Sequence, residues 1–271
     1  MPAQWSSADV TALRRDTRRR AAQRPRGPEL HAVEDLDAGG VGARLYRHAD
    51  ERPLLVFCHG GMWIIGDLDT HDRLCRQIAT GAGVDILAID YRRAPEHPWP
   101  AAVDDAVAAV RFASVGRAVA IGGDSAGGCI AALAALTLRD TGGPAACAQI
   151  LLCPNTDLTA TPPSVPDGGL DPGAVRAAAE LWAPDAASAS PLHAPDLRGL
   201  PPAVVITAER DPLRDEGDAY ARRLADAGVP VTHRCEPGLP HGFVQNMDLV
   251  SDAAAAATAR AIADIRRIVR V

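Results

Sequence analysis

Short apolar runs alternate with segments of helix length over most of the chain. Six runs of four to six residues have the mostly apolar composition of buried strands: 54–58, 85–89, 118–121, 149–153, 203–208 and 230–235. Helices are predicted between them at about 70–80, 100–113, 127–139 and 215–227, with a last helix over 249–268. Strands that alternate with helices indicate an α/β fold, with a mainly parallel central sheet and helices on both faces.

Two stretches depart from this rhythm. Residues 29–36 and 43–47 alternate between apolar and polar positions around an Asp-Ala-Gly-Gly turn at 37–40, which predicts an antiparallel hairpin. Residues 155–190 are rich in Pro, Gly, Ala and Asp, with one helical piece near 172–182. Their place between two core strands predicts an insertion over one end of the sheet. The pattern as a whole predicts a single domain over residues 1–271.

The first 28 residues carry seven arginines against Asp9 and Asp16, a net charge of +5. Val10, Leu13 and Thr17 fall near helical spacing, which predicts a short amphipathic helix. Its outer face would then be covered by Arg14, Arg15, Arg18, Arg19 and Arg20. A solvated face is the simpler interpretation, and binding of an anionic substrate or partner is the alternative.

A nucleophile motif follows the run 118–121. In a parallel sheet the active site lies at the carboxyl ends of the strands. The sequence Gly-Gly-Asp-Ser-Ala-Gly-Gly at 122–128 contains Gly-x-Ser-x-Gly between a predicted strand and a predicted helix, the context that gives this motif meaning. Small residues at Gly123 and Gly127 permit a tight turn, and the next helix directs its N-terminal N–H groups to the same place. Ser125 is therefore the candidate nucleophile.

A base and an acid are needed beside such a serine. Of eight histidines, His241 follows the last core strand on a predicted loop at 236–240, at the same edge of the sheet as Ser125. Asp211 lies in the loop after the run 203–208, with Glu209 as its competitor. The order Ser125, Asp211, His241 is the chain order of α/β-hydrolase triads.

Two nearby groups invite other interpretations. Asp215 and Glu216 are expected to cap the helix that follows Asp211. The sequence His-Gly-Gly-Met-Trp at 59–63 follows the first core strand, and its small residues let backbone N–H groups approach a developing negative charge. A role for His59 as a metal ligand or base is the alternative to its bracing of this loop by hydrogen bonds.

These motifs together resemble the hormone-sensitive-lipase-like branch of the α/β-hydrolases, which includes bacterial carboxylesterases. The resemblance covers about 54–244 and rests on His-Gly-Gly at 59–61, Asp-Tyr-Arg at 90–92 before Ala-Pro-Glu-His-Pro at 94–98, Gly-Asp-Ser-Ala-Gly-Gly at 123–128, Asp-Pro-Leu-Arg-Asp-Glu-Gly at 211–217 and His-Gly-Phe at 241–243. It implies hydrolysis of mostly short-chain esters without a cofactor. It also implies Ser125, Asp211 and His241 as the triad, in agreement with the analysis of the residues themselves.

The resemblance further implies an oxyanion hole made by the N–H groups of Gly61, Met62 and Ala126. Met62 stands where the family usually has a third glycine. An oxyanion hole uses backbone N–H groups, so this departure bears on substrate size and leaves the chemistry intact.

The resemblance also implies a small helical cap built from about 1–28 and 155–190, of which the N-terminal part is short. Trp63 and Trp182 are candidate apolar walls of the substrate pocket, with core packing as the alternative. Because the cap is modest and aromatic residues make up 4% of the chain, we expect a preference for short acyl groups.

Composition narrows the classes of function. The net charge of −6 and a pI near 5.7 argue against a general affinity for nucleic acid or anionic membranes. All 28 cationic side chains are arginine, which excludes a lysine Schiff base and a lysine-dependent phosphate loop. No apolar run approaches the roughly 20 residues of a membrane span. Residues 1–10 have no apolar secretory core, so we expect a cytoplasmic protein.

The six cysteines contain no Cys-x-x-Cys pair, and no histidine or carboxylate pair beside the motifs has metal-ligand spacing. We therefore expect free structural thiols, no metal ion and no cofactor. Cys58, Cys153 and Cys235 end apolar runs and are predicted to be small buried residues.

The sequence therefore predicts a serine carboxylic-ester hydrolase that acts on short-chain or small-molecule esters through an acyl-enzyme. Amide hydrolysis, deacetylation or acyl transfer in natural-product metabolism is the alternative, because the same fold and triad serve these reactions. A ligand-binding pseudoenzyme is a more distant alternative. The presence of all three triad members argues against it. The expected partner is a small-molecule ester, and the sequence leaves the oligomeric state open, a homodimer included.

Overall fold

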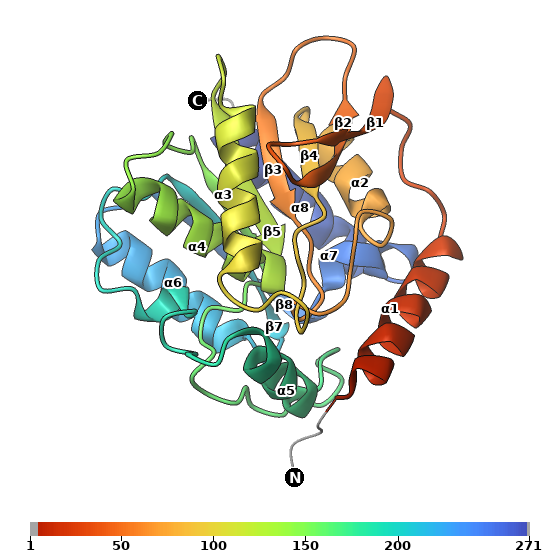
Figure 1. Cartoon of the computed structure of the whole chain (residues 1–271). Coiled ribbons are helices and arrows are strands. Elements are labelled where there is room, and N and C mark those ends of the chain that lie inside the picture. The colour runs from red at the N-terminus through yellow and green to blue at the C-terminus, as the bar shows by residue number, and fades with distance from the viewer. Residues whose placement is uncertain (1–4, 270–271) are drawn as a thin grey trace.

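Eight strands form one mainly parallel sheet in the computed structural model, which describes residues 5–269. The strands are β1 (Ala32–Asp37), β2 (Gly42–Arg47), β3 (Leu54–Cys58), β4 (Asp85–Ile89), β5 (Val119–Asp124), β6 (Gln149–Leu152), β7 (Ala203–Arg210) and β8 (Val231–Pro240). They lie in the order β1-β2-β4-β3-β5-β6-β7-β8, and all pairs from β4 to β8 are parallel. The predicted hairpin is the antiparallel pair β1–β2, which continues the sheet beyond β4 (Figure 1). The predicted α/β fold is confirmed.

Four helices connect parallel strands: α2 (Asp72–Ala82), α3 (Ala101–Ala113), α4 (Ala126–Asp140) and α6 (Arg214–Asp226). A further helix, α8 (Asp252–Ile268), follows the last strand. The last helix begins later than the predicted 249–268, because α7 (Phe243–Asn246) and a 3₁₀ turn (Met247–Leu249) precede it. The Ser251 hydroxyl then caps α8 by accepting a hydrogen bond from the Ala254 N–H. Within residues 5–269, no helix combines the length and apolar composition needed to cross a membrane.

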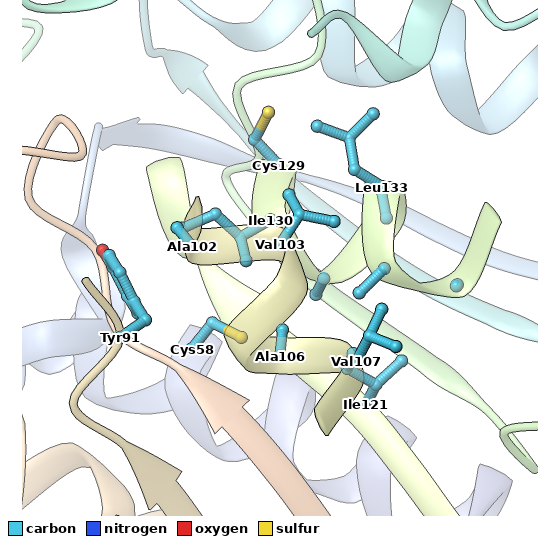
Figure 2. Packing of buried hydrophobic residues seen from close by; sticks show 14 of the residues in the cluster. Cys58, Tyr91, Ala102, Val103, Ala106, Val107, Ile121, Cys129, Ile130 and Leu133 are labelled. Atoms are coloured by element: carbon cyan, nitrogen blue, oxygen red, sulfur yellow. The ribbon is translucent and has the colours of Figure 1, made fainter. Parts of the chain in front are cut away.

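The core lies in two layers because successive strand residues point to opposite faces of the sheet. In β3, Leu54, Val56 and Cys58 pack on the side covered by α3, α4 and α6. Leu55 and Phe57 pack on the other side, against α2 and α8. Figure 2 shows the first layer, where β3 and β5 meet α3 and α4. All five β3 residues are buried, which explains why this strand is a continuous apolar run.

The last strand is longer than the sequence predicts. The predicted loop 236–240 is the second half of β8. Its pairing with β7 is regular as far as Ala208 opposite Glu236 and then slips, so that Arg210 lies opposite Pro240. Proline and glycine in this stretch indicated a loop, but β8 is an edge strand, which tolerates both.

The cysteines are free thiols, as predicted. Cys58, the last residue of β3, and Cys153, which directly follows β6, are both buried. The predicted burial of Cys235 is wrong, because this residue lies on the edge strand β8 and is exposed.

Two helices lie at the end of the sheet where the parallel strands finish. They are α1 (Ser7–Ala22) and α5 (Pro172–Trp182), at the lower side of Figure 1. α1 begins with a capping box in which the Ser6 hydroxyl accepts from the Asp9 N–H and the Asp9 carboxylate accepts from the Ser6 N–H. α5 begins after Asp171, whose carboxylate accepts from the Ala174 N–H.

The arginines of α1 do not all lie on its outer face. Val10 is buried, as the helical spacing predicts. Arg14, however, turns inward to pair with Glu96, and Arg18 pairs with Asp67. The predicted solvated position of Arg14 is wrong, because carbonyl and carboxylate oxygens from two distant loops face this side of the helix. Hydrophobic spacing carries no information about such acceptors.

Replacement of Phe57 by Ala should lower the free energy of unfolding by about 3–5 kcal/mol, because it removes a fully buried ring and leaves a cavity between the sheet and α2. Urea denaturation would measure this loss. Phe112→Ala is the matched control. Phe112 is 48% exposed on α3, so its loss should cost no more than about 0.5 kcal/mol. Equal losses in the two variants would contradict the assignment of Phe57 to the core.

Candidate active site

Ser125 lies in a strained turn between β5 and α4. Its φ of 55° is in the left-handed region, which non-glycine residues rarely adopt. The turn is held by the Ser125 N–H, which donates to the Leu152 carbonyl at 2.8 Å. A side-chain carbon at Gly127 would lie 2.0 Å from the Cys58 carbonyl oxygen, so this glycine is required by the close approach of β3. The turn leaves Ser125 only 7% exposed.

The three predicted triad residues come together. Nε2 of His241 lies 2.9 Å from Oγ of Ser125, and Nδ1 of His241 lies 2.8 Å from Oδ2 of Asp211. With its Nδ1–H donated to Asp211, the neutral imidazole can accept the serine proton at Nε2. The other Asp211 oxygen accepts from the Leu213 N–H at 2.8 Å, which orients the carboxylate.

The other acidic residues of this region have different partners. Glu209 is exposed and accepts from the Gly238 N–H at 2.6 Å, so it does not contact His241. Glu216, which the sequence assigned to a helix cap, accepts instead from the Asn155 side chain and the Thr156 N–H, both at 2.6 Å. Its carboxylate therefore holds the beginning of the 155–190 insertion. The cap prediction for Glu216 is wrong because the donors come from a distant segment.

The charge of Asp211 controls the protonation of His241. Burial lowers the pKa of His241, but the adjacent Asp211 carboxylate and its hydrogen bond outweigh this effect, and the pKa is raised above its ordinary value. The imidazole is consequently a better base, and its protonated form is stabilised by a neighbouring negative charge.

The loop after β3 has an unusual backbone. Met62 and Trp63 have φ values of 53° and 59°, and Gly61 has 130°. For non-glycine residues the left-handed region costs roughly 1–2 kcal/mol each, so neighbouring contacts must hold this loop. The Gly61 carbonyl accepts from the N–H groups of Ile64 and Ile65 at 3.1 and 2.9 Å, which closes the turn.

The predicted oxyanion donors lie on this turn and on α4. In residues 5–269, the N–H groups of Gly61, Met62 and Ala126 donate to no other protein atom. Ala126 is the first residue of α4, where the helix dipole favours a negative charge. Backbone N–H groups left without a partner beside a nucleophile are suited to bind an oxyanion.

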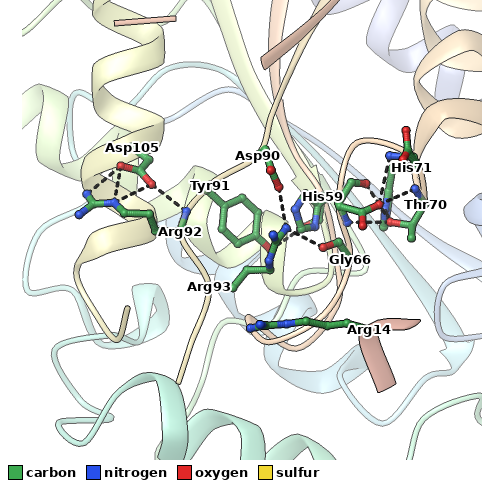
Figure 3. Close-up of polar contacts among 12 residues, drawn as sticks. Arg14, His59, Gly66, Thr70, His71, Asp90, Tyr91, Arg92, Arg93 and Asp105 are labelled. Atoms are coloured by element: carbon green, nitrogen blue, oxygen red, sulfur yellow. Dashed lines mark hydrogen bonds and ion pairs between the residues drawn. The ribbon is translucent and has the colours of Figure 1, made fainter. Parts of the chain in front are cut away.

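His59 braces the loop, as the simpler interpretation of the sequence predicted. Its Nδ1–H donates to the Gly60 carbonyl at 2.9 Å, and its ring stacks on Tyr91 at 4.2 Å. The Tyr91 hydroxyl donates to the His59 carbonyl at 2.8 Å. Burial, with the neighbouring His71, lowers the pKa of His59 to about 3, so the ring is neutral. Figure 3 shows His59 between Tyr91 and His71.

Asp124 links the two halves of the site. This buried carboxylate accepts from the Gly60 N–H at 2.9 Å and from the Gln245 side chain at 2.7 Å. Burial raises the pKa of Asp124, but His71 and the two donors outweigh this and lower it below its ordinary value. The residue before Ser125 therefore connects the loop after β3 to the segment after His241. Sequence analysis missed this role, although Asp124 stands inside the Gly-x-Ser-x-Gly motif.

Trp63 and Trp182 stack on one another with ring centroids 4.7 Å apart. Neither side chain has exposed surface. The two rings therefore pack in the core, which was the alternative to a role in the substrate pocket. A role as pocket walls stays a prediction.

One group of three metal-ligating side chains occurs among the described residues: Cys153, Asp211 and His241, whose ligand atoms lie within 4.8 Å of one another. Both ring nitrogens of His241 already take part in the triad, so the arrangement fits proton transfer. Burial, with the charge of Asp211, raises the pKa of the Cys153 thiol well above its usual range. Cys153 is thus a neutral neighbour of Asp211 that no sequence motif indicated.

The site therefore places Ser125, His241 and Asp211 in the hydrogen-bonded arrangement that is typical of serine hydrolases, at one edge of an α/β sheet. Residues 55–245 match a family described as having the alpha/beta hydrolase fold. The chain is 39% identical to the esterase LipI of Mycobacterium tuberculosis, over 98% of this chain and 91% of that protein. It is 41% identical to the carboxylic ester hydrolase LipN of the same species, over 95% of this chain and 76% of that protein.

A solved ester hydrolase from the metagenome of Lake Arreo, in complex with a bipyridine phosphonate derivative, has a similar structure. Its TM-score is 0.87 at 34% identity, and the match covers 97% of this chain and 91% of that one. The chain belongs to the α/β-hydrolase family, in the hormone-sensitive-lipase-like carboxylesterase branch that its motifs resemble. It is an enzyme of the carboxylesterase type.

Replacement of Asp211 by Asn should reduce kcat/KM by about 10⁴, because the base loses the partner that sets its tautomer. In the parent enzyme activity should fall as the pH drops through the raised pKa of His241, since only the neutral ring is a base. Removal of the carboxylate charge should move this midpoint to lower pH.

The pH profile of kcat/KM would measure both effects. Glu209→Gln is the control, because Glu209 contacts Gly238 rather than His241. It should leave the rate and the midpoint unchanged. If Glu209→Gln, and not Asp211→Asn, shifted the profile, Glu209 would be the acid of the triad.

Proposed function

We propose that Ser125, Asp211 and His241 carry out the ester hydrolysis of this carboxylesterase-type enzyme through an acyl-enzyme. The observation that carries this proposal is the continuous hydrogen-bond chain from Oγ of Ser125 through the imidazole to the Asp211 carboxylate. His241 takes the serine proton as Oγ attacks the carbonyl carbon of the ester. The new C–O bond places a negative charge on the former carbonyl oxygen.

The N–H groups of Gly61, Met62 and Ala126 are proposed to bind that oxygen. Collapse of the intermediate breaks the bond to the leaving alcohol, and His241 gives its proton to the departing oxygen. A water molecule then attacks the acyl-enzyme with His241 as base, which releases the acid and restores Ser125. No step requires a metal ion or a cofactor.

The substrate class is proposed to be short-chain or small-molecule esters. Ser125 is 7% exposed and the side chain of His241 is 8% exposed, so little open surface surrounds the reacting atoms. We further propose that 1–28 and 155–190 form the cap over this site, although residues 1–4 lie outside the described structure. The His241 N–H donates to the Gly168 carbonyl at 2.9 Å, which brings the insertion into direct contact with the site.

An alkyl phosphonate ester that mimics the tetrahedral intermediate would test the nucleophile. We expect it to label the parent enzyme with one adduct at Ser125, located by peptide mass spectrometry. Ser125→Ala should stay folded, because it loses a single hydroxyl, and should retain no more than about one part in 10³ of the activity. Higher residual activity would place the nucleophile elsewhere. Parallel assays with amide and lactone substrates would decide whether ester hydrolysis is the preferred reaction.

The rate of hydrolysis should depend on the length of the acyl group, and Met62 should help to limit the size of the ester that the pocket accepts. We expect kcat/KM for p-nitrophenyl esters to decline beyond about ten acyl carbons, since longer groups need an extended apolar cleft. Met62→Gly keeps the N–H, relieves the left-handed φ of 53° and removes a flexible apolar side chain. It should hydrolyse short esters at the parent rate and bulkier esters faster. An unchanged acyl-length profile in this variant would exclude Met62 from the pocket.

A further inference from the structure

Arg14 of α1 makes four hydrogen bonds to two loops more than 45 residues away in the sequence. Its Nε–H donates to the Ile64 carbonyl at 2.7 Å, and Nη2–H donates to the Ala94 carbonyl at 2.8 Å. Nη1 and Nη2 also form a bidentate pair with the Glu96 carboxylate, at 2.7 and 2.8 Å. The planar guanidinium fork suits such a set of acceptors, which a lysine could not bind together.

The two carbonyls belong to loops that are also joined to one another. The Ala94 N–H donates to the Trp63 carbonyl at 3.1 Å. Arg14 therefore closes a ring of contacts that runs from Ile64 to Ala94 and back to Trp63. Figure 3 shows Arg14 alongside this region, next to the loop that carries Gly66.

Ile64 is part of the same turn as the oxyanion donors. Its N–H donates to the Gly61 carbonyl at 3.1 Å, so its carbonyl and the N–H groups of Gly61 and Met62 belong to one short turn. Met62 and Trp63 both have left-handed φ values, and a turn of this kind persists where surrounding contacts hold it. The Ile64 carbonyl is held from outside the sheet by Arg14.

Arg14 differs in this respect from Arg19 of the same helix. Its side chain is 24% exposed, whereas that of Arg19 is 69% exposed and pairs with Asp16 of the same helix at 3.3 Å. The hydrogen bond from Arg14 holds the pKa of Glu96 at about 2, so the partner carboxylate stays charged over the range in which the triad works.

We propose that Arg14 is a positioning residue for the oxyanion hole, which it supports by holding the turn of Gly61 and Met62 through the Ile64 carbonyl. This role rests on the proposed function. It makes α1 a part of the catalytic machinery in addition to a cover over the site. Loss of Arg14 should weaken binding of the transition state more than binding of the ground state, because the oxyanion forms only during the reaction.

The test compares Arg14→Gln with Arg19→Gln in the full chain, using p-nitrophenyl acetate and an alkyl trifluoromethyl ketone. The ketone adds to the serine and places a negative oxygen in the oxyanion hole. For Arg14→Gln we expect kcat to fall about 10–100-fold, with KM within about threefold of the parent. The inhibition constant of the ketone should weaken by a similar factor. Arg19→Gln should match the parent in all three quantities.

Two further variants separate positioning from general stability. Glu96→Gln removes the ion pair but leaves the Ile64 and Ala94 carbonyls available to Arg14, so its loss in kcat should be smaller than that of Arg14→Gln. Arg14→Lys keeps the charge but cannot bridge the two carbonyls, so it should lose kcat and ketone affinity together. Circular dichroism at the assay temperature shows which variants are folded. If Arg14→Gln is not folded, Arg14→Lys takes its place in the comparison with Arg19→Gln.

A folded Arg14 variant that keeps the parent kcat and ketone affinity, with only a lower melting temperature, would overturn the proposal and leave the proposed function intact. A parent enzyme that is not labelled at Ser125 by the phosphonate would overturn the proposed function itself. A parent that labels and a variant that loses kcat and ketone affinity in parallel would support both.

Discussion

The site depends on how closely the ends of β3 and β5 approach one another. A side-chain carbon at Gly127 would lie 2.0 Å from the Cys58 carbonyl oxygen, and one at Gly123 would lie 2.4 Å from it. Both distances are far below van der Waals contact, so this approach requires glycine at both positions. Because Ser125 lies between the two glycines and the turn of Gly61 and Met62 follows Cys58, the approach brings the proposed nucleophile close to the proposed oxyanion donors.

Segments outside the sheet then hold each half of this arrangement. α1 contacts the turn after β3 through Arg14, and the insertion contacts His241, whose N–H donates to the Gly168 carbonyl. Arg210 adds a second link, since its guanidinium donates to the Pro166 carbonyl and to Asp167, both at 3.0 Å. Both segments that are proposed to form the cap are therefore hydrogen-bonded to residues of the proposed site or to their immediate neighbours.

Much of the sheet could be predicted from local patterns in the sequence. The strands were predictable because parallel strands buried on both faces read as short apolar runs, and β3 and β4 begin and end where their runs do. The full length of the edge strand β8 was not predictable. Its second half contains the proline and glycine typical of a loop, and only its pairing with β7 makes it a strand. Glu216 was predicted to cap a helix because it lies near the start of one. Its carboxylate instead accepts hydrogen bonds from Asn155 and Thr156, which are distant in the sequence.

The sequence by itself determined the order of the strands along the chain and the strand–turn–helix unit that carries Ser125, and it predicted the triad. Each of these rests on residues next to a strand end and on the rule that such ends share one edge of the sheet. The tertiary structure alone decided which polar side chains support that site. Arg14, Asp124 and Cys153 contact residues brought near them by folding. Hydrophobic spacing determines which face of an element is buried, whereas hydrogen bonds depend on the relative positions of distant loops, and those positions exist only after the sheet has assembled.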